Sequence, residues 1–71
     1  MTNEKLMLAE VLAALYQSEI NCGLQSFWDG GWIVRIGDEL NGFLATETVA
    51  DLESAAAWLD ANARRLFPQS W

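Results

Sequence analysis

Residues 22–37, CGLQSFWDGGWIVRIG, contain two apolar, β-prone runs separated by Asp29-Gly30-Gly31. Two such runs joined by a short glycine-containing loop are typical of a β-hairpin. A three-residue loop built from a type I turn and a left-handed residue needs a glycine where φ is positive, and Gly31 occupies that place. The stretch therefore predicts two antiparallel strands, against which the rest of the chain must pack.

This loop length also predicts the register of the hairpin, with Trp28 opposite Trp32, Ser26 opposite Val34 and Leu24 opposite Ile36. One face then carries the apolar side chains of Leu24, Trp28, Trp32, Val34 and Ile36. The opposite face carries Gln25, Phe27, Ile33 and Arg35. A two-residue loop would shift the pairing by one and scatter the apolar side chains over both faces. We therefore expect the first face to be buried, with both tryptophans and the small side chain of Cys22 in the core.

The segment before the hairpin, residues 3–20, predicts an amphipathic helix. One apolar stripe at the helical period should cover the sheet, and it consists of Leu8, Val11, Leu12 and Leu15. A second stripe consists of Leu6, Ala9, Ala13, Tyr16 and Ile20. This second stripe is either a contact with another helix of the same domain or an exposed patch that pairs with another chain.

The segment after the hairpin predicts a strand and then a helix. Residues 43–47 read as the strand, and its inward side chains are either Leu44, Thr46 and Thr48 or Phe43 and Ala45. Thr48 and Asp51 have the spacing of a capping box, which predicts that the last helix opens there, and Pro68 stops it.

These elements predict one domain over residues 1–71, in the order helix, three-stranded antiparallel meander, helix. We expect an α+β fold of two layers, with both helices on one face of the sheet. The order resembles the α-β-β-β-α topology of double-stranded RNA-binding domains. Those domains carry a basic cluster at the start of their last helix, whereas residues 49–53, VADLE, are acidic here. The resemblance is one of topology alone, because fold does not imply function.

The composition excludes several classes of site. The chain of 71 residues has one cysteine, no histidine and a formal net charge of −6. An intrachain disulfide, a structural zinc site and a histidine-dependent nucleophile are therefore excluded. The negative charge argues against binding nucleic acid through its phosphates. No apolar run approaches the roughly 20 residues of a membrane span, and the N-terminal segment does not read as a signal peptide, so we expect no membrane partner and a cytoplasmic location.

Acidic side chains offer the few candidates for chemistry. Asp29 and Glu39 as a catalytic pair would need a cleft that a sheet of this size hardly provides. Asp38, Glu39 and Asn41 have too few ligands at the offsets of a calcium loop, and a turn explains them better. We therefore expect no catalytic residue, no metal site and no cofactor.

A surplus of apolar side chains favours a non-catalytic interaction module that self-associates as a homodimer or binds another protein. Hydrophobic residues make up 52% of the chain, and four of them are tryptophans. The candidate interface residues are Phe27, Ile33, Arg35, Trp58, Trp71, Leu6, Ala13 and Tyr16. The sheet face with Phe27 and Arg35 is favoured, because phenylalanine and arginine suit interface cores. The alternative is an acidic inhibitor or nucleic-acid-mimicking decoy, whose carboxylates bind a basic protein surface.

Overall fold

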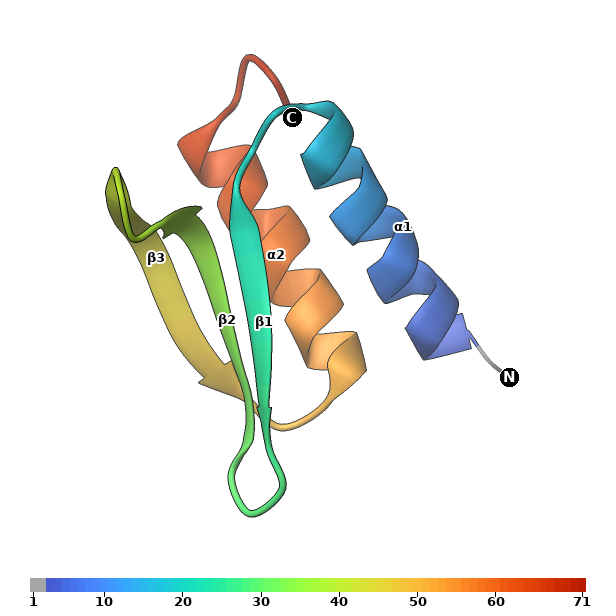
Figure 1. Cartoon of the computed structure of the whole chain (residues 1–71). Helices are drawn as coiled ribbons and strands as arrows, with labels where there is room; N and C mark the ends of the chain where they lie inside the picture. The colour runs from blue at the N-terminus through green and yellow to red at the C-terminus, as the bar shows by residue number, and fades with distance from the viewer. Residues whose placement is uncertain (1–2) are drawn as a thin grey trace.

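The computed structural model describes residues 3–71, and the side chains from Met7 onward. It has two helices and three strands in the order α1 (Asn3–Gln17), β1 (Cys22–Phe27), β2 (Gly31–Asp38), β3 (Gly42–Val49) and α2 (Leu52–Leu66). The strands form one antiparallel sheet in the order β1-β2-β3. Both helices lie on the same side of this sheet and run in the same direction (Figure 1). The predicted α+β fold with an α-β-β-β-α meander is confirmed.

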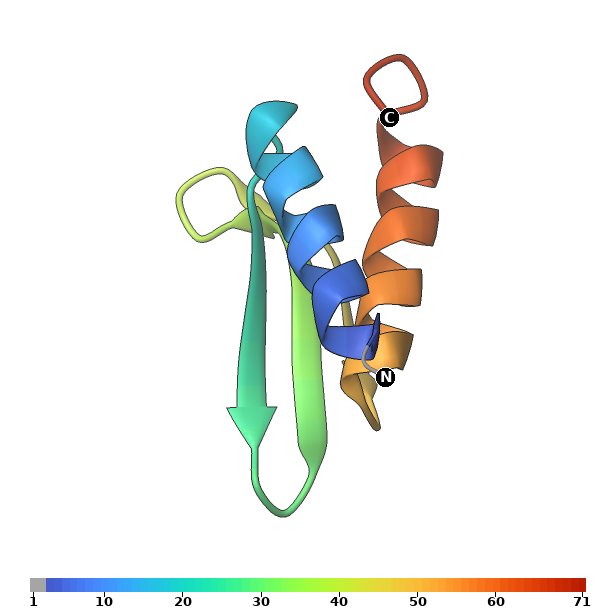
Figure 2. The same ribbon diagram turned by 90° about the vertical axis from the view of Figure 1, so that its right-hand side faces the viewer.

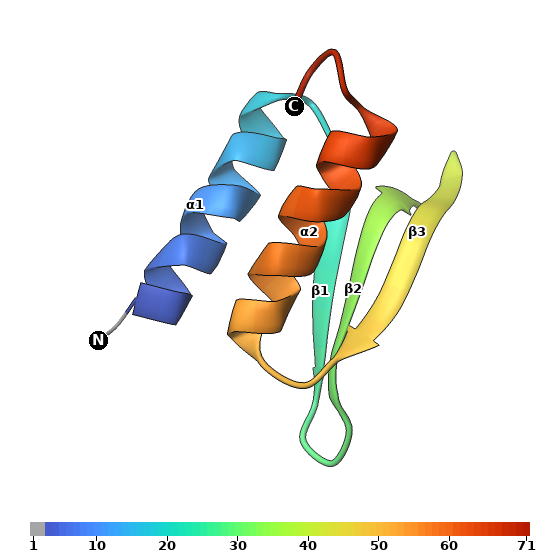
Figure 3. The same ribbon diagram turned by 180° about the vertical axis from the view of Figure 1, so that it is seen from behind.

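The molecule is thin, 31 × 25 × 16 Å, because it has only two layers. From the helix side, α2 lies against β2 and β3, and α1 lies beside α2 (Figure 2). The opposite face of the sheet carries no helix or strand in residues 3–71 (Figure 3).

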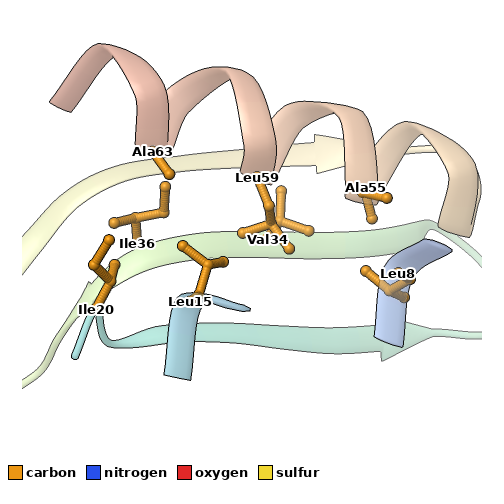
Figure 4. Packing of buried hydrophobic residues seen from close by; sticks show 9 residues of the cluster. Leu8, Leu15, Ile20, Val34, Ile36, Ala55, Leu59 and Ala63 are labelled. Carbon is orange, nitrogen blue, oxygen red and sulfur yellow. The ribbon is translucent and has the colours of Figure 1, made fainter. Parts of the chain in front are cut away.

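The core forms where α1 and α2 meet β2. Leu59 and Ala63 of α2 point toward Val34 and Ile36 of β2, and Leu15 of α1 approaches from the side (Figure 4). The fully buried members are aliphatic, and no polar side chain is buried among the described residues. Alanines along α2 let this helix approach the sheet closely. Burying apolar surface of this kind contributes about 25 cal/mol per Å².

The hairpin pairs with a register that differs from the prediction by two residues. Leu24 lies opposite Val34, Ser26 opposite Trp32, and Phe27 opposite Gly31. A shift of two leaves every side chain on its predicted face, because side chains alternate with a period of two. Gly31 has a positive φ of 93°, as predicted, and a Cβ atom there would lie 2.5 Å from the carbonyl oxygen of Val49.

The prediction that Trp28 packs in the core is wrong. Because the strands pair two residues earlier than expected, Trp28 falls in the turn and is 97% exposed. Trp32 stays on the helix side of β2 and is half-buried.

The first helix ends three residues earlier than predicted. Glu19 adopts a positive φ of 61°, which stops the helix and directs Ile20 into the core. The second stripe is therefore not a contact between helices, since Ala9, Ala13 and Tyr16 are exposed.

The third strand is longer than predicted, and Thr48 does not cap α2. Thr48 pairs with Ile33 inside β3. The N-cap is Asp51, whose carboxylate accepts a hydrogen bond of 2.7 Å from the backbone N–H of Ser54. This bond lowers the pKa of Asp51, because it stabilises the charged form.

Candidate interaction surface

No helix or strand of residues 3–71 covers the side of the sheet that faces away from the helices (Figure 3). Val34 and Ile36 point into the core, so Ile33 and Arg35 between them point outward. The side chains of the β1 and β3 residues that pair with Ile33 and Arg35 also point away from the helices. We call this surface the outer face, and it consists of Gln25, Phe27, Ile33, Arg35, Phe43, Thr46 and Thr48.

A β-bulge in β3 decides which of its side chains reach the outer face. Ala45 pairs with Ile36, but the next pair joins Phe43 to Gly37, so Leu44 is an extra residue on β3. The bulge places Ala45 on the helix side and Phe43 on the outer face. Neither alternation considered for this strand therefore holds over its whole length.

Phe43 lies on the outer face, although the sequence left its direction open and it was not among the predicted interface residues. The guanidinium carbon of Arg35 lies 5.3 Å from the centre of the Phe43 ring, within the range of a cation–π interaction. Phe43 remains 46% exposed and Phe27 40% exposed, so both residues are partly accessible to solvent. Ile33 and Arg35 are half-buried by their neighbours on the face.

The outer face carries no carboxylate at any of its strand positions, although the chain has ten acidic residues against four basic ones. Arg35 is its one charged member. Depletion of acidic side chains and enrichment of phenylalanine and arginine characterise the cores of protein interfaces. The outer face thus shares these two features of composition with interface cores.

The structure divides the predicted interface residues among three places. Phe27, Ile33 and Arg35 share the outer face. Ala13 and Tyr16 lie exposed on α1, and Tyr16 is 80% exposed. The side chain of Leu6 lies outside the described side chains.

Trp58 and Trp71 belong to the helix layer. Both are half-buried against the core. The tail folds back through a bond from the Trp71 backbone N–H to the Phe67 carbonyl at 2.8 Å, and the indole Nε1–H donates to Asp60 Oδ1 at 2.9 Å. These two tryptophans therefore stabilise the fold rather than extend the outer face.

The surface is hollowed at the end where α1 stops. Two adjoining depressions of about 450 and 200 Å³ share the residues Glu19, Ile20 and Asn21. The Asp38 carboxylate at this end accepts hydrogen bonds of 2.6 Å from the Asn41 backbone N–H and from Asn21 Nδ2. These bonds, the backbone one first, lower the pKa of Asp38, and they show that its carboxylate holds the β2–β3 turn against the start of β1.

The other residues considered for catalysis are either far from each other or partly buried. Asp29 lies in the β1–β2 turn and Glu39 in the β2–β3 turn, which are at opposite ends of the sheet (Figure 1). Cys22 is half-buried on the helix side, where burial raises the pKa of its thiol. Among the side chains from Met7 onward, no three histidine, cysteine, aspartate or glutamate residues gather as metal ligands would.

No protein-family model, no curated protein and no solved structure is significantly similar to this chain. Neither described helix combines the length and the apolar character that crossing a membrane requires. A function for this protein must therefore be inferred from the residues of the outer face.

Proposed function

We propose that this protein is a small non-catalytic protein-interaction module that self-associates by packing the outer face of one copy against that of another. The observation that supports the proposal is the composition of this face, which combines two exposed phenylalanines with the absence of carboxylates. In a chain with a net charge of −6, two copies repel each other least where neither presents an acidic side chain.

Arg35 is compatible with this packing because of where its charge lies. Its guanidinium already rests over the Phe43 ring, and Arg35 as a residue is half-buried in one copy. A twofold axis would use the same residues on both copies. The threonines Thr46 and Thr48 border the aromatic side chains and suit the rim of such a contact.

The alternative of an acidic decoy has less support from the described carboxylates. Asp51 caps α2, and Asp38 closes the β2–β3 turn. Asp60 accepts hydrogen bonds from Arg64 and from Trp71. These three carboxylates have intramolecular partners, and Asp38 lies in β2 whereas Asp51 and Asp60 belong to α2 and its N-cap.

The proposal is tested by the molar mass in solution, measured by size-exclusion chromatography with light scattering over a dilution series. The wild-type mass should be a multiple of the 7.9 kDa chain and should persist on dilution. A Phe27→Thr/Phe43→Thr variant should have a lower mass, because threonine keeps the strand propensity and removes the rings. A control, Tyr16→Gln/Leu40→Ser, removes two exposed apolar side chains outside the outer face and should keep the wild-type mass.

Two results would contradict the proposal. The first is a wild-type mass equal to one chain at every concentration. The second is a Phe27→Thr/Phe43→Thr variant with the same mass as the wild type, since the outer face would then not contribute to association.

A further inference from the structure

The backbone of β1 presents unpaired hydrogen-bonding groups at one border of the sheet. The backbone N–H of Gly37 donates to the Asn21 carbonyl at 2.7 Å, so these residues form a hydrogen-bonded pair of the antiparallel ladder. Hydrogen-bonded and non-hydrogen-bonded pairs alternate along such a ladder. The N–H and C=O groups of Cys22, Leu24 and Ser26 therefore point away from β2, toward the free edge.

This edge is open along most of its length. β1 is the first strand of the sheet order, and among residues 3–71 no helix or strand lies beyond it (Figure 2). Only the β2–β3 turn reaches its beginning, where Asn21 Nδ2 bonds to Asp38. The backbone groups of Leu24 and Ser26 lie further along the strand.

The β1 edge also lacks the features by which proteins prevent edge strands from pairing. Charged side chains, prolines and bulges serve that purpose. The sequence of β1, CGLQSF, contains no charge and no proline, and its register with β2 is unbroken. The opposite edge strand, β3, has both the bulge at Leu44 and the exposed carboxylate of Glu47.

We propose that β1 pairs with β1 of a second copy, antiparallel and about a twofold axis that passes beside Leu24. This inference rests on the proposed self-association and adds a second contact between copies. In this register Leu24 faces Leu24, and Cys22 faces Ser26 of the second copy. The three residues of each strand whose backbone groups point to the free edge are then all paired. This pairing forms about six backbone hydrogen bonds.

A second copy is the occupant because the strand is complementary to itself. No charged side chains face each other across the twofold axis. On the outer side Gln25 faces Gly23 of the second copy, and there is open space around Gly23, where a Cβ atom would meet no other atom within 4 Å. On the helix side the two half-buried Leu24 side chains extend the apolar layer from one copy to the next.

Edge pairing also provides the area that the outer face needs. Three strands of six to eight residues cover roughly 15 × 23 Å, or about 350 Å² in outline, from the usual strand spacing and rise. A standard interface buries about 800 Å² on each partner. Joining two β1 edges doubles the sheet to six strands, so two such sheets can pack through an adequate face, with the helices outside. The resulting assembly has four copies.

The first experiment compares a proline on each edge by light scattering after size exclusion. Ser26→Pro removes an N–H that points to the free edge of β1 and leaves the β1–β2 ladder intact. Thr46→Pro is the matched control, since Val34 and Ile36 bond to β3 through Glu47 and Ala45, which leaves the Thr46 N–H pointing to the free edge of β3. The wild type and Thr46→Pro should have four times the mass of the chain, and Ser26→Pro at most half of that. A Ser26→Pro protein with the wild-type mass would overturn the edge pairing.

The second experiment needs no variant and therefore does not depend on the folding of Ser26→Pro. Amide hydrogen exchange of the wild type should be slow at Leu24 and fast at Thr46, although both N–H groups point away from the sheet of their own copy. Equally fast exchange at Leu24 and Thr46 at high concentration would overturn the pairing.

The failure of each proposal has its own signature. A wild type that is a monomer at every concentration contradicts both. The wild type could instead be a dimer that dissociates in Phe27→Thr/Phe43→Thr but stays intact in Ser26→Pro. That result contradicts only the edge pairing. The wild type could also be a dimer that dissociates in Ser26→Pro but stays intact in the double variant. That result supports the edge pairing and contradicts the packing of outer faces.

Discussion

Replacing Glu19 with glycine should stabilise the protein. Among the described residues, Glu19 is the one position other than glycine with a positive φ. Its N–H donates to the Tyr16 carbonyl at 3.1 Å, and the N–H of Ile20 donates to the Leu15 carbonyl at 2.9 Å. This pair of bonds is the Schellman motif, and the residue in the place of Glu19 is usually glycine. The buried contact between Ile20 and Leu15 that accompanies the motif holds the backbone in this conformation.

The expected gain follows from two opposing contributions. A left-handed conformation costs a residue with a Cβ atom about 1–2 kcal/mol. Glycine loses more conformational entropy on folding than other residues do. This loss offsets about 0.5–1 kcal/mol of the stability gained by removing the Cβ atom. The free energy of unfolding should therefore rise by about 0.5–1 kcal/mol. In a domain of this size about 1 kcal/mol corresponds to about 4–8 °C in Tm, so the expected increase is about 2–8 °C.

Urea denaturation and thermal melting followed by circular dichroism would measure this gain. Both need equal protein concentrations, because self-association raises the apparent stability. Glu19→Ala is the matched control, since it removes the same carboxylate from the helix end and keeps the Cβ atom. If Glu19→Gly is no more stable than Glu19→Ala, the backbone conformation is not the source of the cost and the reasoning is refuted.

Three further changes test other parts of the fold. Leu59→Ala removes a fully buried side chain between α2 and β2 and should lower the free energy of unfolding by about 2–5 kcal/mol, measured by urea denaturation; a change below about 1 kcal/mol would contradict its place in the core. Gly37→Ala should be strongly destabilising, since its φ is +107° and the new Cβ would lie 2.5 Å from the Gly42 carbonyl oxygen, whereas Gly23→Ala in open space should have little effect in the same assay. Asp51 has a lowered pKa in the folded state, so its contribution is present above the unfolded pKa of about 3.9 and is lost as the pH falls through the folded value. Melting between pH 2.5 and 6 should therefore show an acid-induced loss that is smaller in Asp51→Ala, and an unchanged loss would exclude the cap as its source.

The faces of the hairpin could be predicted from the sequence, but its register could not. Alternation of apolar and polar residues assigns each side chain to a face, and Val34, Ile36 and Ile33 lie where the pattern put them. A shift of two residues conserves that pattern, so hydrophobicity does not distinguish the two registers. The turn geometry decides between them, and it moves Trp28 from the expected core to the tip of the hairpin.

The outer face was predicted in part, for a similar reason. Phe27, Ile33 and Arg35 follow from the alternation of the hairpin alone. Phe43 joins them only because the bulge at Leu44 reverses the alternation within β3. The bulge depends on how β3 meets the β2–β3 turn, and a single strand's sequence does not record that contact.

The sequence by itself determined the order of the elements, the buried stripe of α1 and the alternating faces of the hairpin, because these depend on local periodicity and on turn residues such as Gly31. Only the tertiary structure decided the exposure of Trp28 and Tyr16, the arrival of Phe43 on the outer face and the folding of Trp71 onto the core. The positions of Trp28 and Phe43 depend on the backbone geometry of a turn and a bulge, and those of Tyr16 and Trp71 on how neighbouring segments pack. A helical or strand period repeats along one segment and carries no information about where the next segment lies.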